Sequence, residues 1–376
     1  MRISDCGFRI DVLSTLKRYC VTLLLASLYT LSAAASARSP VFIKDPEQRK
    51  AYYKAIARGE LAGAVGKWEQ ACDAFREATR IAPDVVEGHQ AYQDAMEQLG
   101  KREELLAQYR SKLERQPDSA LVHYLLGRIA SDLAEKEKLL LAAVRLDPSL
   151  SWAYYALGHL YEHAEKWNQS ESAFRKVTEL RPNWAEGHNA LGFCFLQQGK
   201  NDAAEAAFKK ALDTNPRYVD ALVNLGVIAL RGKQYARTVE YSRKALEIDK
   251  SNPKALNNLG KAYYYQGLLR DAVEAYKKAL ESPDVDRPEV VYLNLGFCYY
   301  RMQEFDQAAA AYERAVSINP TFGYGYYCLA QAKYRQKAYE DAWKAVRQAE
   351  KLGYDVRRHE RFLKMLSAEL VEPGKP

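Results

Sequence analysis

Proline, glycine and cysteine are scarce in this 376-residue sequence, which contains 13, 20 and 6 of them respectively. So few prolines and glycines exclude a collagen-like or low-complexity chain. Hydrophobic residues make up 48% and charged residues 27%, values that exclude disorder of the whole chain. The net charge is only +7, and the charges are interspersed rather than gathered into the basic patch of a nucleic-acid binder. We therefore expect no nucleic acid among the partners.

Motifs that carry known chemistry are also missing from the sequence. It contains no glycine-rich phosphate loop, no nucleophile elbow and no zinc-protease signature. His159 and His163 lie one helical turn apart and could share a metal ion, but two ligands are too few, and Glu162 between them is expected to point elsewhere. The sequence therefore predicts that the protein is not an enzyme and that it has no cofactor and no metal site.

Residues 1–37 have the features of an export signal. Basic residues precede a mostly apolar run that begins at Cys20, and small residues follow it. Ala35 and Ala37 stand at the two positions that a signal peptidase reads, so we expect cleavage before Arg38. The alternative is an uncleaved membrane anchor formed by the same run, which is barely long enough to span a bilayer. In either case the sequence predicts a periplasmic or secreted body.

A small residue recurs with a nearly constant period along the sequence. Gly158, Gly192, Gly226 and Gly260 follow one another at intervals of 34 residues, and Gly296 and Ala330 continue the series. Each is followed nineteen residues later by an alanine or valine, and in most repeats a large residue stands three residues before that. A period of this length indicates an array of similar units. The alanine or valine positions are Val177, Ala211, Ala245, Ala279, Ala315 and Ala349, and the large residues are Phe174, Phe208, Tyr276 and Tyr312.

The pattern resembles the tetratricopeptide repeat, in which each unit is a pair of helices joined by a tight turn. Small residues at positions 8, 20 and 27 of that repeat let the two helices approach closely. An aromatic residue stands at position 24, and proline at position 32 ends the second helix. Glycine at position 15 supplies the turn, as at Gly66, Gly100, Gly199 and Gly267.

The resemblance implies an all-α fold, a right-handed α-solenoid of about nine helix-turn-helix units over residues 52–356. The two small residues of the unit at 120–150 are closer together than in the other units, so we expect a shorter turn there. Residues 357–370 are predicted to form a capping helix. Residues 38–51 and 371–376 are predicted to be flexible.

Four cysteines, Cys72, Cys194, Cys298 and Cys328, would remain after the leader is removed. They are widely spaced and form no CxxC motif, which gives no support for zinc or thioredoxin-like chemistry. Cys194 and Cys298 stand beside a repeat glycine, where small side chains pack, so buried thiols are expected. The alternative is a disulfide between Cys298 and Cys328, which belong to adjacent repeats.

The first helices carry a second stripe of residues that helix pairing does not need. Asparagine recurs in it, together with much of the excess of tyrosine, which totals 27 residues against 11 phenylalanines. In the family this stripe lines the concave surface, where asparagine can hold the backbone of an extended ligand. The alternative is that these side chains pack between neighbouring first helices. The resemblance thus implies a peptide-binding groove lined by Asn224, Asn258, Asn294, Phe193, Tyr264, Phe297, Tyr300 and Tyr327.

A solenoid offers long surfaces rather than an enclosed pocket, which favours binding over catalysis. We expect a scaffold or assembly factor of the cell envelope that binds a protein or peptide in its groove. One alternative is an accessory subunit of a membrane-associated polysaccharide or secretion complex that works through its outer surface. Another is a glycan-binding module, because stacked tyrosines also suit sugars. Asn257, Asn258 and Lys261 match only a fragment of the family's heat-shock-protein clamp, so that specificity is not expected.

Overall fold

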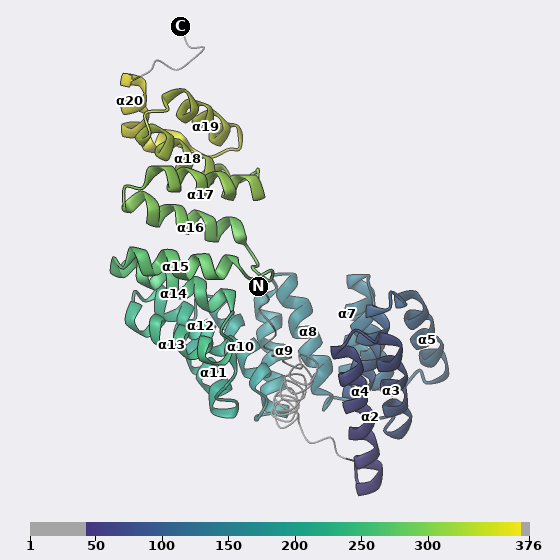
Figure 1. Ribbon diagram of the computed structural model, residues 1–376. Coiled ribbons are helices and arrows are strands. Elements are labelled where there is room, and N and C mark those ends of the chain that lie inside the picture. The colour runs from purple at the N-terminus through teal and green to yellow at the C-terminus, as the bar shows by residue number, and fades with distance from the viewer. Residues whose placement is uncertain (1–42, 370–376) are drawn as a thin grey trace, which may run out of the picture. The chain divides into compact units, whose positions relative to one another are not determined.

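The computed structural model describes residues 43–369, and every regular element within that range is a helix (Figure 1). Helices α2 to α19 form nine consecutive pairs, and a short 3-10 turn and α20 follow them. This confirms the all-α array of about nine helix-turn-helix units. The chain divides into two compact units, the first ending at Gly187 and the second beginning at His188.

The first unit contains four helix pairs and the start of a fifth. The pairs are α2 (Pro46–Ala64) with α3 (Trp68–Ile81), α4 (Val86–Gln98) with α5 (Arg102–Arg115), α6 (Ala120–Ile129) with α7 (Leu133–Leu146), and α8 (Ser151–His163) with α9 (Trp167–Leu180). Helix α10 (Ala185–Gln197) begins in this unit and continues into the second.

The second unit holds the remaining pairs and the C-terminal helix. In chain order its elements after α10 are α11 (Asn201–Thr214), α12 (Val219–Arg231), α13 (Tyr235–Ile248), α14 (Pro253–Gln266), α15 (Leu269–Leu280), α16 (Pro288–Arg301), α17 (Phe305–Ile318), α18 (Gly323–Arg335), α19 (Tyr339–Lys351), the 3-10 turn Val356–His359 and α20 (Glu360–Glu369).

The glycine at position 8 of a repeat lies against the aromatic ring at position 24. A Cβ added at Gly158 would be 2.5 Å from the Phe174 ring, and one added at Gly260 would be 2.6 Å from the Tyr276 ring. Real side chains cannot approach so closely, so each ring occupies the space that the absent Cβ leaves. This contact explains why a small residue and a ring recur at a fixed spacing.

The turn between paired helices is made by a residue with positive φ. Glycine fills this place at Gly66, Gly100, Gly199 and Gly267, as expected. In four other repeats a larger residue adopts the same left-handed conformation, although it costs an L-residue about 1–2 kcal/mol. These residues are Glu165, Lys233, Gln303 and Lys337. The repeat of α6 and α7 has the shorter turn that its spacing predicts, because α6 ends at Ile129 and α7 begins at Leu133.

The ends of the helical array differ slightly from the expectation. Helix α2 begins at Pro46, where the side chain of Asp45 accepts hydrogen bonds from two backbone amides, so residues 46–51 are helical rather than flexible. At the other end the 3-10 turn accounts for the first residues of the predicted capping helix, and α20 forms the rest. The predicted signal sequence and the tail at 371–376 lie outside the described residues. Within those residues, no helix is both long and apolar enough to cross a bilayer.

All four cysteines of the described chain are buried thiols, as the repeat positions of two of them predict. Cys298 and Cys328 are not joined by a disulfide. Burial in apolar surroundings raises the pKa of each of these two thiols to about 12. Thiols with such a pKa are almost wholly protonated at neutral pH, so they act as packing residues rather than nucleophiles.

Candidate functional site

The predicted groove residues come from the first helices of consecutive repeats in the second unit. We call them, together with Asn189, Asn257 and Lys261, the first-helix stripe. Residues three or four apart on one helix share a face, so Asn257, Lys261 and Tyr264 line up along α14. The same spacing brings Asn294 and Phe297 together on α16. Each helix therefore contributes a short row of polar and aromatic side chains to the stripe.

Two pairs of half-buried asparagines connect neighbouring helices of the stripe. The side-chain amide nitrogen of Asn224 donates to the side-chain oxygen of Asn189, at 3.1 Å, and that of Asn294 donates to Asn257, at 3.4 Å. Each bond uses one hydrogen of one amide and one oxygen of the other. An asparagine has two donors and an oxygen acceptor, so both pairs keep hydrogen-bonding capacity for a ligand.

Asn258 has a different environment from the one expected of a groove residue. It is buried, with 5% of its surface exposed, and its side-chain amide donates to the backbone oxygen of Val223 at 3.2 Å. The preceding repeat has Ser242 rather than a ring at position 24, and the amide of Asn258 lies near the resulting space beside Gly226. Asn258 therefore connects two repeats, and the alternative of packing between first helices holds for this residue.

Four of the five predicted aromatic residues are half-buried, namely Phe193, Tyr264, Phe297 and Tyr300. The guanidinium of Arg301 lies 4.8 Å from the centre of the Tyr264 ring and also donates to the backbone oxygen of that residue. The guanidinium of Arg335 lies 5.8 Å from the centre of the Tyr300 ring and 4.2 Å from that of the Phe305 ring. Each of these two rings thus has one side covered by an arginine of the next repeat, which adds a cation–π contact to the stacking of repeats.

Tyr327 does not line an open surface. Its ring is 4% exposed and stacks on the His359 ring, with 4.2 Å between the ring centres. The Phe362 ring meets it edge-on, and Gln331 donates to its hydroxyl at 3.0 Å. The C-terminal cap covers this end of the stripe, so Tyr327 is a packing residue and not a groove residue.

Lys261, like Asn189 and Asn257, is a residue of the stripe that the sequence did not single out as a ligand-binding candidate. It is half-buried near the middle of α14, and desolvation lowers the pKa of its amine. Among the residues that the structure describes, none forms a hydrogen bond or an ion pair with it. A partly desolvated cation without a counter-charge is unfavourable, and a carboxylate supplied by a ligand would offset that cost.

The basic residues of the second helices differ from Lys261 because acidic residues of the same helix pair with them. Lys244 lies 2.7 Å from Glu240, and Lys278 lies 2.8 Å from Glu274, both one helical turn apart. Exposed pairs of this kind contribute little to stability, because solvent screens them. These lysines of the second helices are therefore neutralised within their own helix, whereas Lys261 is not.

The histidines that were considered as metal ligands belong to another contact. His159 Nδ1 lies 2.9 Å from a carboxylate oxygen of Glu162, so Glu162 points toward His159 and not elsewhere. In residues 43–369, no group of three or more histidine, cysteine, aspartate or glutamate side chains is placed to hold a metal ion.

The repeats match known family models. A model described as tetratricopeptide repeat matches residues 253–281 and 290–322, and a second model of that description matches 155–213 and 194–253. The chain is a tetratricopeptide-repeat protein. The matched residues include α10, α12 and α14 of the first-helix stripe, and α16 from residue 290 onward.

This tetratricopeptide-repeat protein is 32% identical over 79 residues to a TPR repeat-containing protein of Methanocaldococcus jannaschii. The match spans 20% of this chain and 14% of that relative's length.

Among solved structures, the crystal structure of the APC/C hetero-tetramer Cut9–Hcn1 is similar, with a TM-score of 0.55 and 16% identity, over 93% of this chain and 83% of that chain. A tetratricopeptide repeat protein from Parabacteroides merdae has a TM-score of 0.49 and 18% identity, over 70% of this chain and 98% of its own. The similarity to the Cut9–Hcn1 structure supports the fold of the tetratricopeptide-repeat protein.

Proposed function

We propose that this tetratricopeptide-repeat protein is a non-catalytic scaffold that binds an extended segment of a partner protein along the first-helix stripe of its second unit. The main support is Lys261, a half-buried cation without a counter-charge among the described residues. A carboxylate of the partner segment would pair with it in a partly desolvated place, where such a bond is stronger than at the surface.

The asparagine pairs on either side of Lys261 support the same proposal. Asn257 lies one turn before Lys261 on α14 and is bonded to Asn294 of the next first helix, while Asn189 and Asn224 form the other pair. Their remaining donors and acceptors suit the backbone of an extended segment, because backbone groups have no side-chain identity to match. Phe193 and Phe297 then offer apolar area for its side chains.

The peptide preference of wild-type protein and of a Lys261→Gln variant tests this proposal. A random-peptide phage library panned on the wild type should yield peptides that share an acidic residue. A selected peptide should bind Lys261→Gln about tenfold more weakly in calorimetry, because one charge-assisted contact contributes about 1.5 kcal/mol. Glutamine keeps the length and polarity of the side chain while removing its charge.

The matched control is Lys210→Gln, which removes an exposed charge from second helix α11. It should bind the selected peptides as the wild type does, and all three proteins should give the same helical circular dichroism. Selected peptides without an acidic residue, or equal affinity of the wild type and Lys261→Gln, would contradict the proposed site.

We also propose that the protein works in the cell envelope, after cleavage of residues 1–37. The support is the sequence alone, namely the apolar run from Cys20 and the small residues Ala35 and Ala37. Intact-mass measurement of the exported protein should give a chain that begins at Arg38. A mature chain that retains residues 1–37 would favour the membrane anchor instead.

A further inference from the structure

The second repeat departs from the others at two positions that bring paired helices together. Position 8 holds glycine or alanine in the other eight repeats and Gln93 in this one. Position 27 holds alanine or valine in the other eight and Lys112 here. Both larger side chains would obstruct the close contact of the two helices. As this predicts, α4 and α5 share few contacts, whereas the neighbouring pairs α2–α3 and α6–α7 share many.

Gln93 stabilises the open arrangement by bonding to the next repeat. It is fully buried, and its side-chain amide donates to the backbone oxygen of Leu125 at 2.8 Å. Arg128 in turn donates to the side-chain oxygen of Gln93 at 3.0 Å. These bonds satisfy the buried amide and connect α4 to α6.

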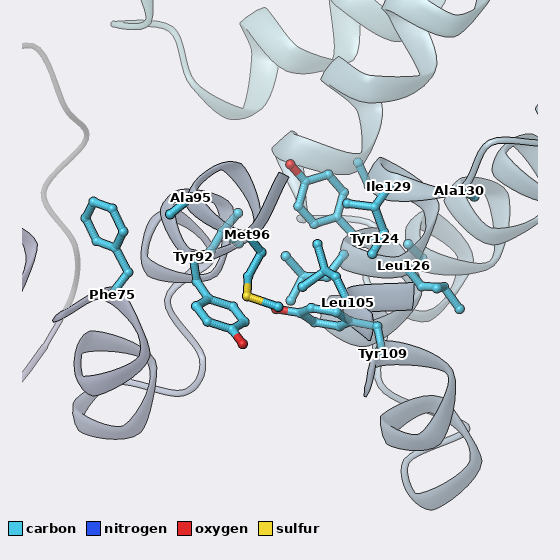
Figure 2. Close-up of a cluster of buried hydrophobic side chains, with 14 of the residues drawn as sticks. Phe75, Tyr92, Ala95, Met96, Leu105, Tyr109, Tyr124, Leu126, Ile129 and Ala130 are labelled. Carbon is cyan, nitrogen blue, oxygen red and sulfur yellow. The ribbon is translucent and has the colours of Figure 1, made fainter. Parts of the chain in front are cut away.

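Tyr109 is the position-24 ring of this repeat, and it has no glycine to pack against. Its hydroxyl instead lies 3.1 Å from Nδ1 of the buried His89, whose Nε2 lies 2.9 Å from the backbone oxygen of Pro83. A carbonyl can only accept, so Nε2 carries the proton and the Tyr109 hydroxyl donates to Nδ1. Figure 2 shows the rings of Tyr92 and Tyr109 with the side chain of Met96 directed toward them.

The separation of α4 and α5 leaves a pocket of about 800 Å³ within the first unit. It lies among helices α3, α4, α5 and α6, and Tyr92 and Tyr109 form part of its wall. This volume is within the range of ligand-binding pockets, which is about 300–1,000 Å³. The hydrogen bonds of His89 and Tyr109 hold that part of the wall in place.

The lining of this pocket is strongly basic. Arg76 and Arg80 lie one turn apart on α3, Lys112 and Arg115 lie one turn apart on α5, and Asp84 is the one acidic residue among the lining side chains. Within the described chain, Arg80, Lys112 and Arg115 have no acidic partner. The amine of Lys112 lies 4.7 Å from the centre of the Tyr109 ring, and desolvation lowers its pKa. Two rows of cations, one on α3 and one on α5, thus line the pocket.

We propose that this pocket binds an acidic segment of a partner polypeptide, with its carboxylates held by Arg80, Lys112 and Arg115. A single small anion could meet only part of the lining, because the cations are distributed over two helices. A segment with several carboxylates can pair with both rows at once. The site is in the first unit and is independent of the first-helix stripe.

Fluorescence anisotropy with a short labelled peptide of alternating glutamate and glycine tests the proposal. The full-length protein should bind it, and affinity should fall as salt is raised. The double variant Lys112→Gln/Arg115→Gln should bind at least about tenfold more weakly, because two charge-assisted contacts are lost. The charge-reversed variant Lys112→Glu/Arg115→Glu should instead bind the corresponding lysine–glycine peptide.

Three controls show whether binding depends on this pocket and on the charge of the peptide. Lys138→Gln removes an exposed charge from α7 outside the pocket and should leave binding unchanged. Lys261→Gln should also leave binding unchanged. A failure of the pocket proposal can therefore be distinguished from a failure of the proposed function of the first-helix stripe. A glutamine–glycine peptide should not bind.

The proposal is overturned if the acidic peptide does not bind the wild type, or binds the double glutamine variant equally well. It is overturned too if the glutamine–glycine peptide binds with equal affinity. Complete displacement of the peptide by inorganic phosphate, at an equal concentration of negative charge, would show that the pocket binds any small anion. That result would also contradict the proposal.

Discussion

Gly226 and Gly260 occupy the same position in consecutive repeats but have different neighbours. A Cβ added at Gly260 would lie 2.6 Å from the buried ring of Tyr276. One added at Gly226 would lie no nearer than 3.5 Å to any neighbour outside its own helix backbone. The difference arises because position 24 is Tyr276 in one repeat and Ser242 in the other. Packing therefore requires glycine only where the paired helix carries a ring.

Alanine substitutions at these two glycines should have opposite effects on stability. Gly260→Ala should destabilise the protein by about 1–3 kcal/mol, because the new methyl group displaces the Tyr276 ring. Gly226→Ala should stabilise it by about 0.5–1 kcal/mol, because alanine is the better helix former and the site has room. Urea unfolding followed by circular dichroism measures both. Equal destabilisation by the two substitutions would show that the ring contact is not what selects glycine.

Helix α20 is the element that ends the array in the second unit. Leu366 is fully buried, and His359 stacks on Tyr327 while its Nε2 lies 2.9 Å from the hydroxyl of Tyr354. An array of helix pairs has an apolar face at each end that no further repeat covers. The cap covers this face with one short helix and several aromatic contacts.

Deletion of residues 357–376 should lower the melting temperature and retain most of the helical circular dichroism. The reason is that the deletion exposes Tyr327 and the other apolar residues of α18. The repeats that precede α18 keep their own neighbours. Deletion of residues 371–376 alone is the matched control and should change the melting temperature little. An unchanged melting temperature after the longer deletion would mean that the contacts of α20 contribute no net stability.

The whole molecule consists of two compact units, and each is stabilised chiefly by contacts between helices that are neighbours in sequence. Stability of such an array approximates a sum of local contributions and interfaces between adjacent repeats. A part of the chain that includes complete repeats should then fold by itself, and the loss of stability should be confined to its new end.

A fragment of residues 183–376 provides the test at this scale. It includes all of α10 and the second unit, and it should show helical circular dichroism with a cooperative thermal transition. A fragment without helical signal would show that stability is not local.

Some features of the fold are visible in the sequence itself. The period of 34 residues predicted nine helix pairs, and the nine pairs are present. Gln93 and Lys112 are also visible in the sequence as exceptions, because the other eight repeats have small residues at these two positions. Positions 8 and 27, compared along the repeats, therefore distinguish α4–α5 as the pair that cannot pack closely.

Other features of the candidate site depend on neighbours that periodicity does not identify. Asn224, Asn258 and Asn294 are equivalent in the repeat, yet Asn258 alone is buried and bonded to the backbone of the preceding repeat. Tyr264 and Tyr327 both belong to the expected stripe, but the cap covers only Tyr327. The sequence could predict the face on which each side chain stands but not the side chains opposite it.

The sequence by itself determined the helix pairs, their number and the packing of small residues against rings, because these depend on spacing within a repeat and recur in each one. The tertiary structure alone decided which stripe residues are accessible, that Lys261 has no counter-charge in the described chain, and that four cations gather around Tyr92 and Tyr109. These properties depend on distances between residues of different repeats. Helical periodicity sets the direction of a side chain, whereas burial and charge depend on everything that packs around it.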